Sequence, residues 1–282
     1  MNNLIPLELY YDIYINLCCF LVLFTLMHTA ILKIDDPKNI VFIRFSGALL
    51  FLFLLLYLGQ RPISGRYFGD MRTYSIYFKK YSLGTPVMGS KDIFFHIFMK
   101  SFSSFVSVNN FFTIIMFIYL YPMLKVSKTL FKDYWYYAFL MFIVSFSFYS
   151  YGTNGIRNGA ATSLFLLGLS FKEKKYAMAV CFLFSVLFHK TMFLPIIAFV
   201  LTYFYNNPRV YLTAWMACIP LSLVFGSVWV ALFSSLDFAD DRLAGYLTAE
   251  VDAQSFSSTG FRWDFLFHSA FAVFSGWYFV IK

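Results

Sequence analysis

The chain is poor in charged residues, in cysteine motifs and in long polar stretches. Only 13% of its 282 residues are charged and 60% are hydrophobic, whereas about a quarter of the residues of an ordinary soluble domain are charged. No polar run is long enough to form a second soluble domain. A soluble or disordered protein is therefore excluded, and residues 1–282 are expected to form one integral membrane domain.

Several catalytic and binding signatures are also missing. The four cysteines form no CxxC pair and have no histidine at metal-ligand spacing, so they indicate neither a metal site nor a redox compartment. The sequence has no GxSxG, HExxH, Walker A or GxGxxG motif, which leaves hydrolase, zinc-protease and nucleotide-binding functions without support. The formal charge of +8 cannot bind nucleic acid from within a bilayer. Because residues 1–12 contain no Lys or Arg, they lack the positive region of a cleaved signal peptide.

Long apolar runs predict an all-α, polytopic transmembrane bundle. A span needs about 20 apolar residues, because each residue rises about 1.5 Å and the hydrocarbon is about 30 Å thick. About nine spans are expected: 13–32, 40–59, 108–124, 134–151, 157–171, 176–188, 191–205, 210–232 and 263–281. The apolar stretch 93–106 is too short to cross unaided, so we expect an interfacial or re-entrant helix there.

Basic residues in the short loops predict the orientation. The loops 125–133, 172–175 and 206–209 together carry seven Lys and Arg, which favour the cytoplasm. This places the N-terminus outside, the C-terminus in the cytoplasm, and the long loops 60–92 and 233–262 on the outer face. Loop 60–92 has six basic and two acidic residues. This excess indicates an outer anion site, although long loops also cross membranes largely regardless of charge.

The segment 151–163, YGTNGIRNGAATS, carries the clearest chemical signal. Asn154 is expected to cap the following helix, which puts Arg157 in its first turn. A cation there opposes the helix dipole, so a negative group is expected nearby. This segment combines a helix N-terminus, a guanidinium and two glycines, Gly155 and Gly159. Such a combination is typical of a phosphate or pyrophosphate site. The alternative is that Arg157 extends to the lipid headgroups.

A second polar group occurs at the turn between two short spans. The spans 176–188 and 191–205 reach only about 20 and 23 Å, which places His189 and Lys190 below the outer surface. A basic residue at that depth costs about 3 kcal/mol unless it faces a polar cavity. We therefore expect Arg157, His189 and Lys190 to share one outward-open cavity. A polar turn at a thinned interface is the alternative.

The outer loops hold further candidates. Within 65–82, aromatic residues at i, i+3, i+4 and i+7 predict an amphipathic helix lying on the membrane. Asp70, between Arg66 and Arg72, is either the N-cap of that helix or a general base or sugar-hydroxyl ligand. In the short helix 93–106, a polar stripe is expected at the edge of a wet cavity: Asp92, His96, Lys100 and Ser104. The acidic and aromatic loop 233–262 suits carbohydrate or an ordinary solvated loop.

These residues together resemble bacterial exopolysaccharide and O-antigen repeat-unit polymerases of the EpsG-like, Wzy-type family. The resemblance depends on the order of weak motifs over most of the chain: Gly69–Asp70 with Thr73–Tyr74, Asp92, Asn154 with Arg157, His189–Lys190, Arg242–Leu243 with Tyr246, and Phe261 to Phe265. Where the family usually has Arg-Gln, this chain has Arg157 and Asn158.

The resemblance implies a metal-independent glycosyltransferase that needs no cofactor and no nucleotide-sugar donor. It would move a glycan from undecaprenyl pyrophosphate onto a lipid-linked repeat unit, at the outer face of the bacterial cytoplasmic membrane. The implied partners are the lipid bilayer, a chain-length regulator and a flippase. The candidate catalytic residues are Arg157, His189 and Asp70. The candidate substrate-binding residues are Arg66, Arg72, Lys190, Asn154, Asn158, Arg242, Tyr246 and Arg262. An O-antigen ligase, another lipid-linked-sugar transferase, and a lipid-linked oligosaccharide flippase or transporter are the alternatives.

Overall fold

Helices make up all the regular secondary structure of the described part of the chain. The computed structural model describes residues 5–88, 92–226, 228 and 263–281. In chain order the elements are η1 (Leu7–Leu9), α1 (Tyr10–Ile31), α2 (Pro37–Gly59), α3 (Gly65–Phe68), α4 (Met71–Ser82), α5 (Ile93–Ser103), α6 (Val108–Phe131), η2 (Lys132–Tyr134), α7 (Trp135–Ile143), α8 (Phe148–Thr153), α9 (Ile156–Ser170), α10 (Lys175–Phe188), η3 (Lys190–Met192), α11 (Phe193–Phe204), α12 (Pro208–Val224), α15 (Trp263–Gly276) and η4 (Trp277–Ile281). The all-α prediction is confirmed for these residues.

Four helical stretches in the described part are long and apolar enough to cross a membrane: Leu7–Ile31, Pro37–Gly59, Val108–Ile143 and Trp263–Ile281. Four apolar helical stretches of 10–17 residues are shorter: Ile93–Ser103, Lys175–Phe188, Lys190–Phe204 and Pro208–Val224. The chain is thus a membrane protein by length and composition. The expected number of about nine spans is not reached by this measure, because several predicted spans fold as short helices.

Two predicted boundaries are wrong around residues 125–151. Helix α6 continues to Phe131, through most of the loop expected at 125–133, and the chain reverses at Lys132, where φ is +49°. The span expected at 134–151 is broken after Ile143. There the Ser145 hydroxyl donates to the Phe142 carbonyl over 2.7 Å, and such local side-chain bonds compete with helical hydrogen bonding. The chain resumes as the separate short helix α8.

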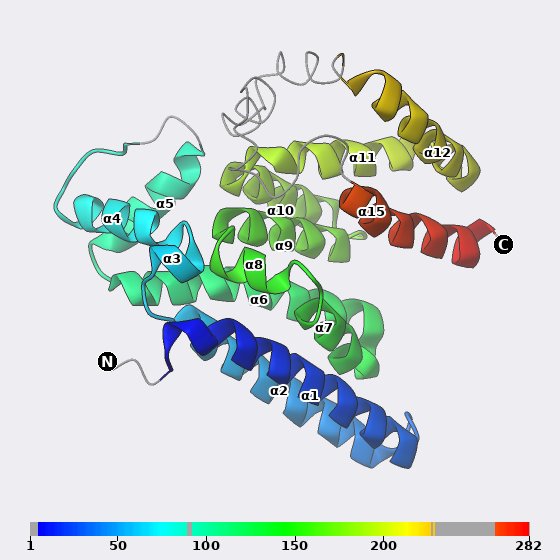
Figure 1. The fold of residues 1–282 in the computed structure, drawn as a ribbon, viewed down its shortest axis with the longest axis horizontal. Coiled ribbons are helices and arrows are strands. Elements are labelled where there is room, and N and C mark those ends of the chain that lie inside the picture. The colour runs from blue at the N-terminus through cyan, green and yellow to red at the C-terminus, as the bar shows by residue number, and fades with distance from the viewer. Residues whose placement is uncertain (1–4, 89–91, 227, 229–262, 282) are drawn as a thin grey trace. The chain divides into compact units, whose positions relative to one another are not determined.

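The chain divides into two compact units, residues 1–196 and 197–282, and the boundary falls within α11. The expectation of one integral membrane domain over residues 1–282 stays a prediction, because this division does not test it. In the first unit, α6 lies at the centre, with α2 on one side and α9 on the other (Figure 1). Helix α9 also packs along α10.

Small residues allow this close packing of α9. A Cβ atom on Gly159 would lie 2.6 Å from the Tyr151 carbonyl oxygen, so the position accepts only glycine without a shift of the backbone. The Ser185 hydroxyl of α10 donates to the Ala161 carbonyl of α9 over 2.7 Å. The two helices are consecutive in sequence and run antiparallel. Arg157 lies one helical turn before Ala161 on α9, and His189 lies one turn after Ser185, just past the end of α10. The packing therefore brings the two candidate residues to the same level.

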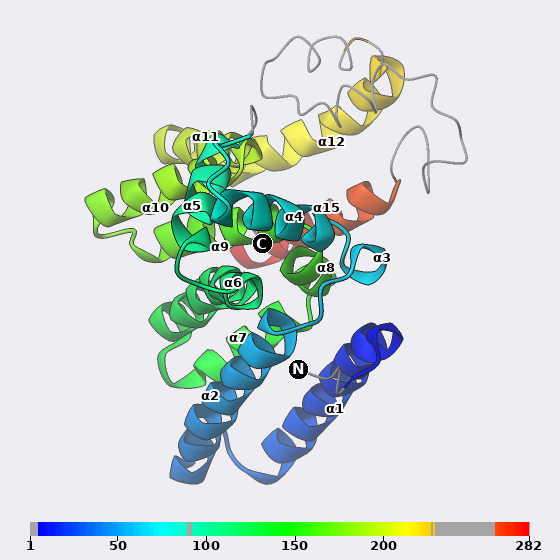
Figure 2. The ribbon, with the colours of Figure 1, turned by 90° about the vertical axis from the view of Figure 1, so that its left-hand side faces the viewer.

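The aromatic helix predicted in 65–82 is present as α4, but its aromatic face packs against protein. Tyr74, Phe78 and Tyr81 are buried. The Tyr74 ring lies 5.2 Å from that of Phe95 in α5, and the Phe78 ring lies 5.2 Å from that of Phe111 in α6. Figure 2 shows this end of the first unit, with α4 and α5 toward the viewer. The expectation that this face lies on the membrane is wrong, because α5 and α6 cover it.

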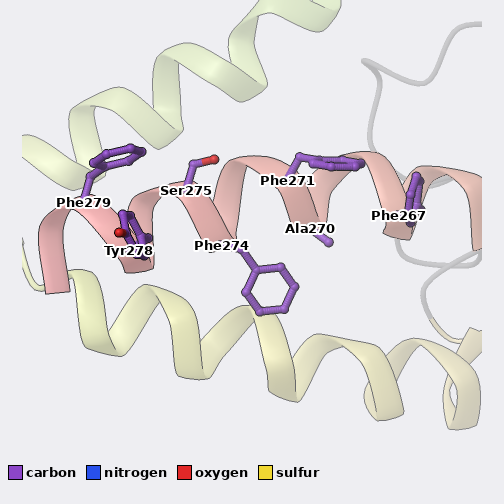
Figure 3. Close-up of a pocket in the computed structure, with 7 residues that line it drawn as sticks. All are labelled: Phe267, Ala270, Phe271, Phe274, Ser275, Tyr278 and Phe279. Carbon is purple, nitrogen blue, oxygen red and sulfur yellow. The ribbon is translucent and has the colours of Figure 1, made fainter. Parts of the chain in front are cut away.

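The second unit contains α12 and α15. The Trp215 indole N–H of α12 donates to the Ser269 hydroxyl over 3.2 Å, and the Trp215 ring lies 6.2 Å from that of Phe274. Residues of α15 and η4 line an apolar hollow of about 460 Å³ (Figure 3): Phe267, Ala270, Phe271, Phe274, Ser275, Tyr278 and Phe279. Because its lining carries no charged side chain, this hollow does not suit an anionic group.

Candidate functional site

The centre of the candidate site is an ion pair between Arg157 and Asp92. Helix α9 begins at Ile156, so Arg157 lies in its first turn, as predicted. Its Nη1 atom donates to Asp92 Oδ2 over 2.7 Å, and the two side chains are 18% and 10% exposed. The guanidinium lies 5.6 Å from the ring centre of Tyr74 and 6.0 Å from that of Phe95. The negative group expected near Arg157 is therefore Asp92, and two aromatic rings lie beside the pair.

The backbone directs the Asp92 carboxylate toward this pair. Asp92 precedes α5 in the left-handed conformation, with φ and ψ both +46°, which aspartate adopts more readily than most residues. Its side chain makes no capping bond to α5. The carboxylate instead reaches across to α9. The sequence reasoning put Asp92 on a polar stripe but not in the site, because the contact joins residues 65 positions apart.

Asn154 joins segment 60–92 to the start of α9. The predicted role of Asn154 as N-cap is wrong, because Gly155 occupies that position and Asn154 still has helical dihedrals. The Asn154 side-chain carbonyl instead accepts the Asp70 backbone N–H over 3.0 Å. A Cβ atom on Gly69 would lie 1.9 Å from Asn154 Oδ1. The contact therefore requires glycine at position 69, where φ is +46°.

Asp70 stands at the N-cap position of α4, but its carboxylate makes no capping bond. The interpretation of Asp70 as simply an N-cap therefore loses its main support. The backbone of Asp70 is fixed by Asn154, three residues before Arg157. Its half-buried side chain thus belongs to the same end of the first unit as the ion pair.

His189 follows α10 and contacts the next turn of the chain. Its Nδ1 atom lies 2.7 Å from the Thr191 hydroxyl, and its side chain caps η3. The neighbouring Phe188 ring lies 6.1 Å from the ring of Phe95, which also contacts Arg157. Phe95 thus lies between the surroundings of Arg157 and those of His189, and the cavity expected to be shared by Arg157, His189 and Lys190 stays a prediction.

The other predicted residues fall into three groups. Arg66, Arg72 and Lys190 are exposed, and the structure does not bring them into the ion pair. Asn158 follows Arg157, and its buried Oδ1 atom has no hydrogen-bond partner among the described residues. Three candidates lie outside the described residues: Arg242, Tyr246 and Arg262. Within the described ranges, no group of three or more His, Cys, Asp and Glu side chains is arranged to hold a metal ion.

His96 is buried beside the ion pair, where the sequence predicted the edge of a wet cavity. It is 7% exposed, because α4 covers it. The Tyr81 hydroxyl accepts the Met88 N–H over 3.2 Å and lies 2.8 Å from His96 Nδ1. This arrangement lets the Tyr81 hydroxyl donate to Nδ1 of a neutral His96 while it accepts from Met88. Burial and, next, the Arg157 cation lower the pKa of His96, while Asp92 opposes them.

The family assignment agrees with these residues. The model of the EpsG family matches residues 44–282. The chain belongs to the EpsG family. This confirms the resemblance inferred from the motifs, and the matched range includes Asp70, Asp92, Asn154, Arg157 and His189. Membership of the EpsG family indicates a membrane polysaccharide polymerase-like role of the glycosyltransferase type. No curated protein and no solved structure matches the chain.

Proposed function

We propose that this EpsG-family protein polymerises a polysaccharide by transferring a growing glycan from undecaprenyl pyrophosphate onto a lipid-linked repeat unit. The reaction would take place at the outer face of the bacterial cytoplasmic membrane. The observation that carries the proposal is the partly exposed guanidinium of Arg157 in the first turn of α9, paired with Asp92 between aromatic rings.

Arg157 suits the leaving group of this reaction. A hydroxyl oxygen of the acceptor sugar forms a bond to the anomeric carbon of the donor, and the bond from that carbon to pyrophosphate oxygen breaks. The electron pair of the broken bond leaves with the pyrophosphate. Cations and helix N-terminal N–H groups that are already in place stabilise such a developing charge. Only Nη1 of Arg157 is engaged with Asp92, so the guanidinium retains further donors for a phosphate oxygen.

The proton of the acceptor hydroxyl needs a base, for which Asp70 and His189 are the candidates. Both belong to the end of the first unit that holds Arg157. An ionised carboxylate or a neutral imidazole accepts a proton at neutral pH. Asp92 is less suited to this task, because its charge already pairs with the guanidinium that would face the leaving group.

An apolar groove supports the lipid part of the proposal. A cavity of about 320 Å³ opens between α1, α2 and α7, and its lining includes Phe20, Phe24, Phe42 and Phe53. At the α3 end of these helices, the Tyr10 ring stacks on Tyr57 and lies 5.5 Å from that of Phe68, next to Gly69. Such a surface suits an isoprenoid chain whose headgroup reaches the segment that carries Asp70.

The test uses the full chain reconstituted in liposomes with the lipid-linked glycan that accumulates in host cells lacking this chain. The wild-type protein is expected to lengthen that glycan, giving a ladder on a gel. Arg157→Ala should lower turnover about 100- to 1,000-fold, as does loss of a preorganised charge stabiliser elsewhere. Arg209→Ala is the matched control, because Arg209 is also the second residue of its helix, α12, and is exposed.

The same assay assigns the base. Asp70→Asn or His189→Gln should lower turnover about 100-fold or more if that residue accepts the proton, and the other variant should then act mainly on substrate affinity. Normal ladders from both variants would contradict this part of the mechanism. A wild-type protein that moves the lipid-linked glycan across the bilayer without lengthening it would be a transporter, and the proposal would fail.

A further inference from the structure

Arg61, just after α2, is buried although it carries a charge. It is 1% exposed. Its guanidinium lies 5.4 Å from the ring centre of Phe68 in α3 and 5.9 Å from that of Phe112 in α6. Among the described residues, no carboxylate forms an ion pair with it. Burial lowers the pKa of Arg61 to about 10, so the group stays positively charged at neutral pH. A buried cation without an anionic partner is costly and needs another source of stabilisation.

Two helix ends provide that stabilisation. Nη1 of Arg61 donates to the Leu58 carbonyl in the last turn of α2, and Nη2 donates to the Thr153 carbonyl at the end of α8 over 2.9 Å. Carbonyl groups at a helix C-terminus lack helical partners and carry the negative end of the helix dipole. The Nε atom has no hydrogen-bond partner. One guanidinium therefore links the C-termini of two helices that are far apart in the sequence.

This link is adjacent to the candidate site. Thr153 precedes Asn154, whose side chain holds the Asp70 N–H, and α9 with Arg157 begins at Ile156. Two contacts thus fix the turn between α8 and α9. Arg61 bonds to the Thr153 carbonyl, and the Asn154 side chain bonds to the backbone of the Gly69–Asp70 segment.

We propose that Arg61 is a positioning residue, which acts on Arg157 by fixing the α8–α9 turn; the role in catalysis rests on the function proposed above. A planar guanidinium reaches two carbonyls at once and stacks between two rings, whereas a lysine ammonium keeps the charge but not this geometry. The Arg61→Lys variant therefore distinguishes the effect of the positive charge from the effect of the guanidinium geometry.

The test compares Arg61→Lys with Arg44→Lys in the liposome assay with the accumulated lipid-linked glycan. Arg44 is exposed on α2 and should tolerate the change. We expect Arg61→Lys to lower kcat about 100-fold, an effect that a displacement of about 1 Å at a reacting group can have, with KM close to wild type and a lowered thermal stability. Arg61→Gln, which keeps one donor without the charge, is the second variant should the lysine protein not fold.

A double-mutant cycle distinguishes positioning from a general structural effect. If Arg61 acts through the turn, Arg61→Lys should cause little further loss of kcat in an Asn154→Ala protein. Equal fold-losses in both backgrounds, or wild-type kcat for Arg61→Lys, would overturn the proposal for Arg61 alone. A wild-type protein that does not lengthen the glycan would overturn the proposed function, and the role of Arg61 in catalysis with it.

Discussion

Neutralising Asp92 tests how the ion pair controls anion binding. In Asp92→Asn, the amide oxygen can still accept from Arg157, but the negative charge is gone. The hydrogen bond to the charged guanidinium remains, but the attraction between the opposite charges is lost, which costs about 1 kcal/mol at the upper end for solvent-exposed pairs. The pair is only 10–18% exposed, so solvent reduces this cost little. We therefore expect the variant to lose about 1 kcal/mol of stability.

The same change should strengthen anion binding at Arg157. A carboxylate about 6 Å from a bound phosphate repels it by about 3 kcal/mol at an effective dielectric constant of about 20. Screening by the water and salt that reach the bound phosphate lowers this value toward about 1.4 kcal/mol, which corresponds to about tenfold in affinity. Turnover should fall instead, because a neutral amide oxygen holds the Nη1 atom of Arg157 more weakly than the carboxylate does.

Titration calorimetry of the full chain in micelles with farnesyl pyrophosphate measures the affinity. Farnesol, which lacks the phosphates, measures how much the apolar tail contributes to the binding affinity. Asp35→Asn, at an exposed carboxylate between α1 and α2, is the matched control. The gain in affinity should shrink at high salt. Equal or weaker binding of farnesyl pyrophosphate by Asp92→Asn would refute the idea that Asp92 and the phosphate compete for Arg157.

Two further predictions concern the surroundings of the pair. Gly69→Ala should abolish the Asn154–Asp70 contact and lower turnover, because its Cβ would lie 1.9 Å from Asn154 Oδ1. Gly84→Ala is the control: Gly84 also has a positive φ, but no atom lies within 4 Å of an added Cβ, so this variant should lose stability without losing activity. Retained activity in Gly69→Ala would contradict the role of this contact. Because the pKa of His96 is lowered from its ordinary value of 6.5, stability should be full above about pH 6.5 and fall at lower pH, where the unfolded chain binds more protons. Thermal unfolding between about pH 7.5 and about pH 5 should show this fall in the wild type and a smaller one in His96→Gln.

Local patterns predicted the parts of the site that depend on one segment. The first-turn position of Arg157 followed from the expected N-cap at Asn154, which lies one residue before the observed N-cap at Gly155. The helix dipole then indicated an anionic neighbour. The identity of that neighbour did not follow, because Asp92 reaches Arg157 through the packing of α5 against α10 and α6. The short length of α5 was predicted, but its burial of His96 was not, since it depends on α4 covering that face.

Asn154 and Arg61 show why the remaining contacts were missed. An asparagine before a helix is a good capping residue by type, yet here its side chain bonds 84 positions away in sequence. Arg61 is one of several basic residues in segment 60–92, and its sequence neighbours do not distinguish it from the exposed Arg66 and Arg72. Its burial depends on Phe68, Phe112 and two helix ends that meet only in the folded chain.

The contact between Lys128 and Trp135 has a consequence for the depth of the site in the bilayer. The Lys128 ammonium lies 4.6 Å from the Trp135 ring centre, and Trp and Lys prefer the interface between hydrocarbon and headgroups. Val108, at the other end of α6, is about 30 Å away along the helix, which is about one hydrocarbon thickness. Phe111, in the first turn of α6, packs against Phe95, which contacts Arg157. We therefore infer that the guanidinium lies near the headgroups of the opposite leaflet. If the function proposed above holds, a lipid pyrophosphate would reach it there while its tail stays in the membrane.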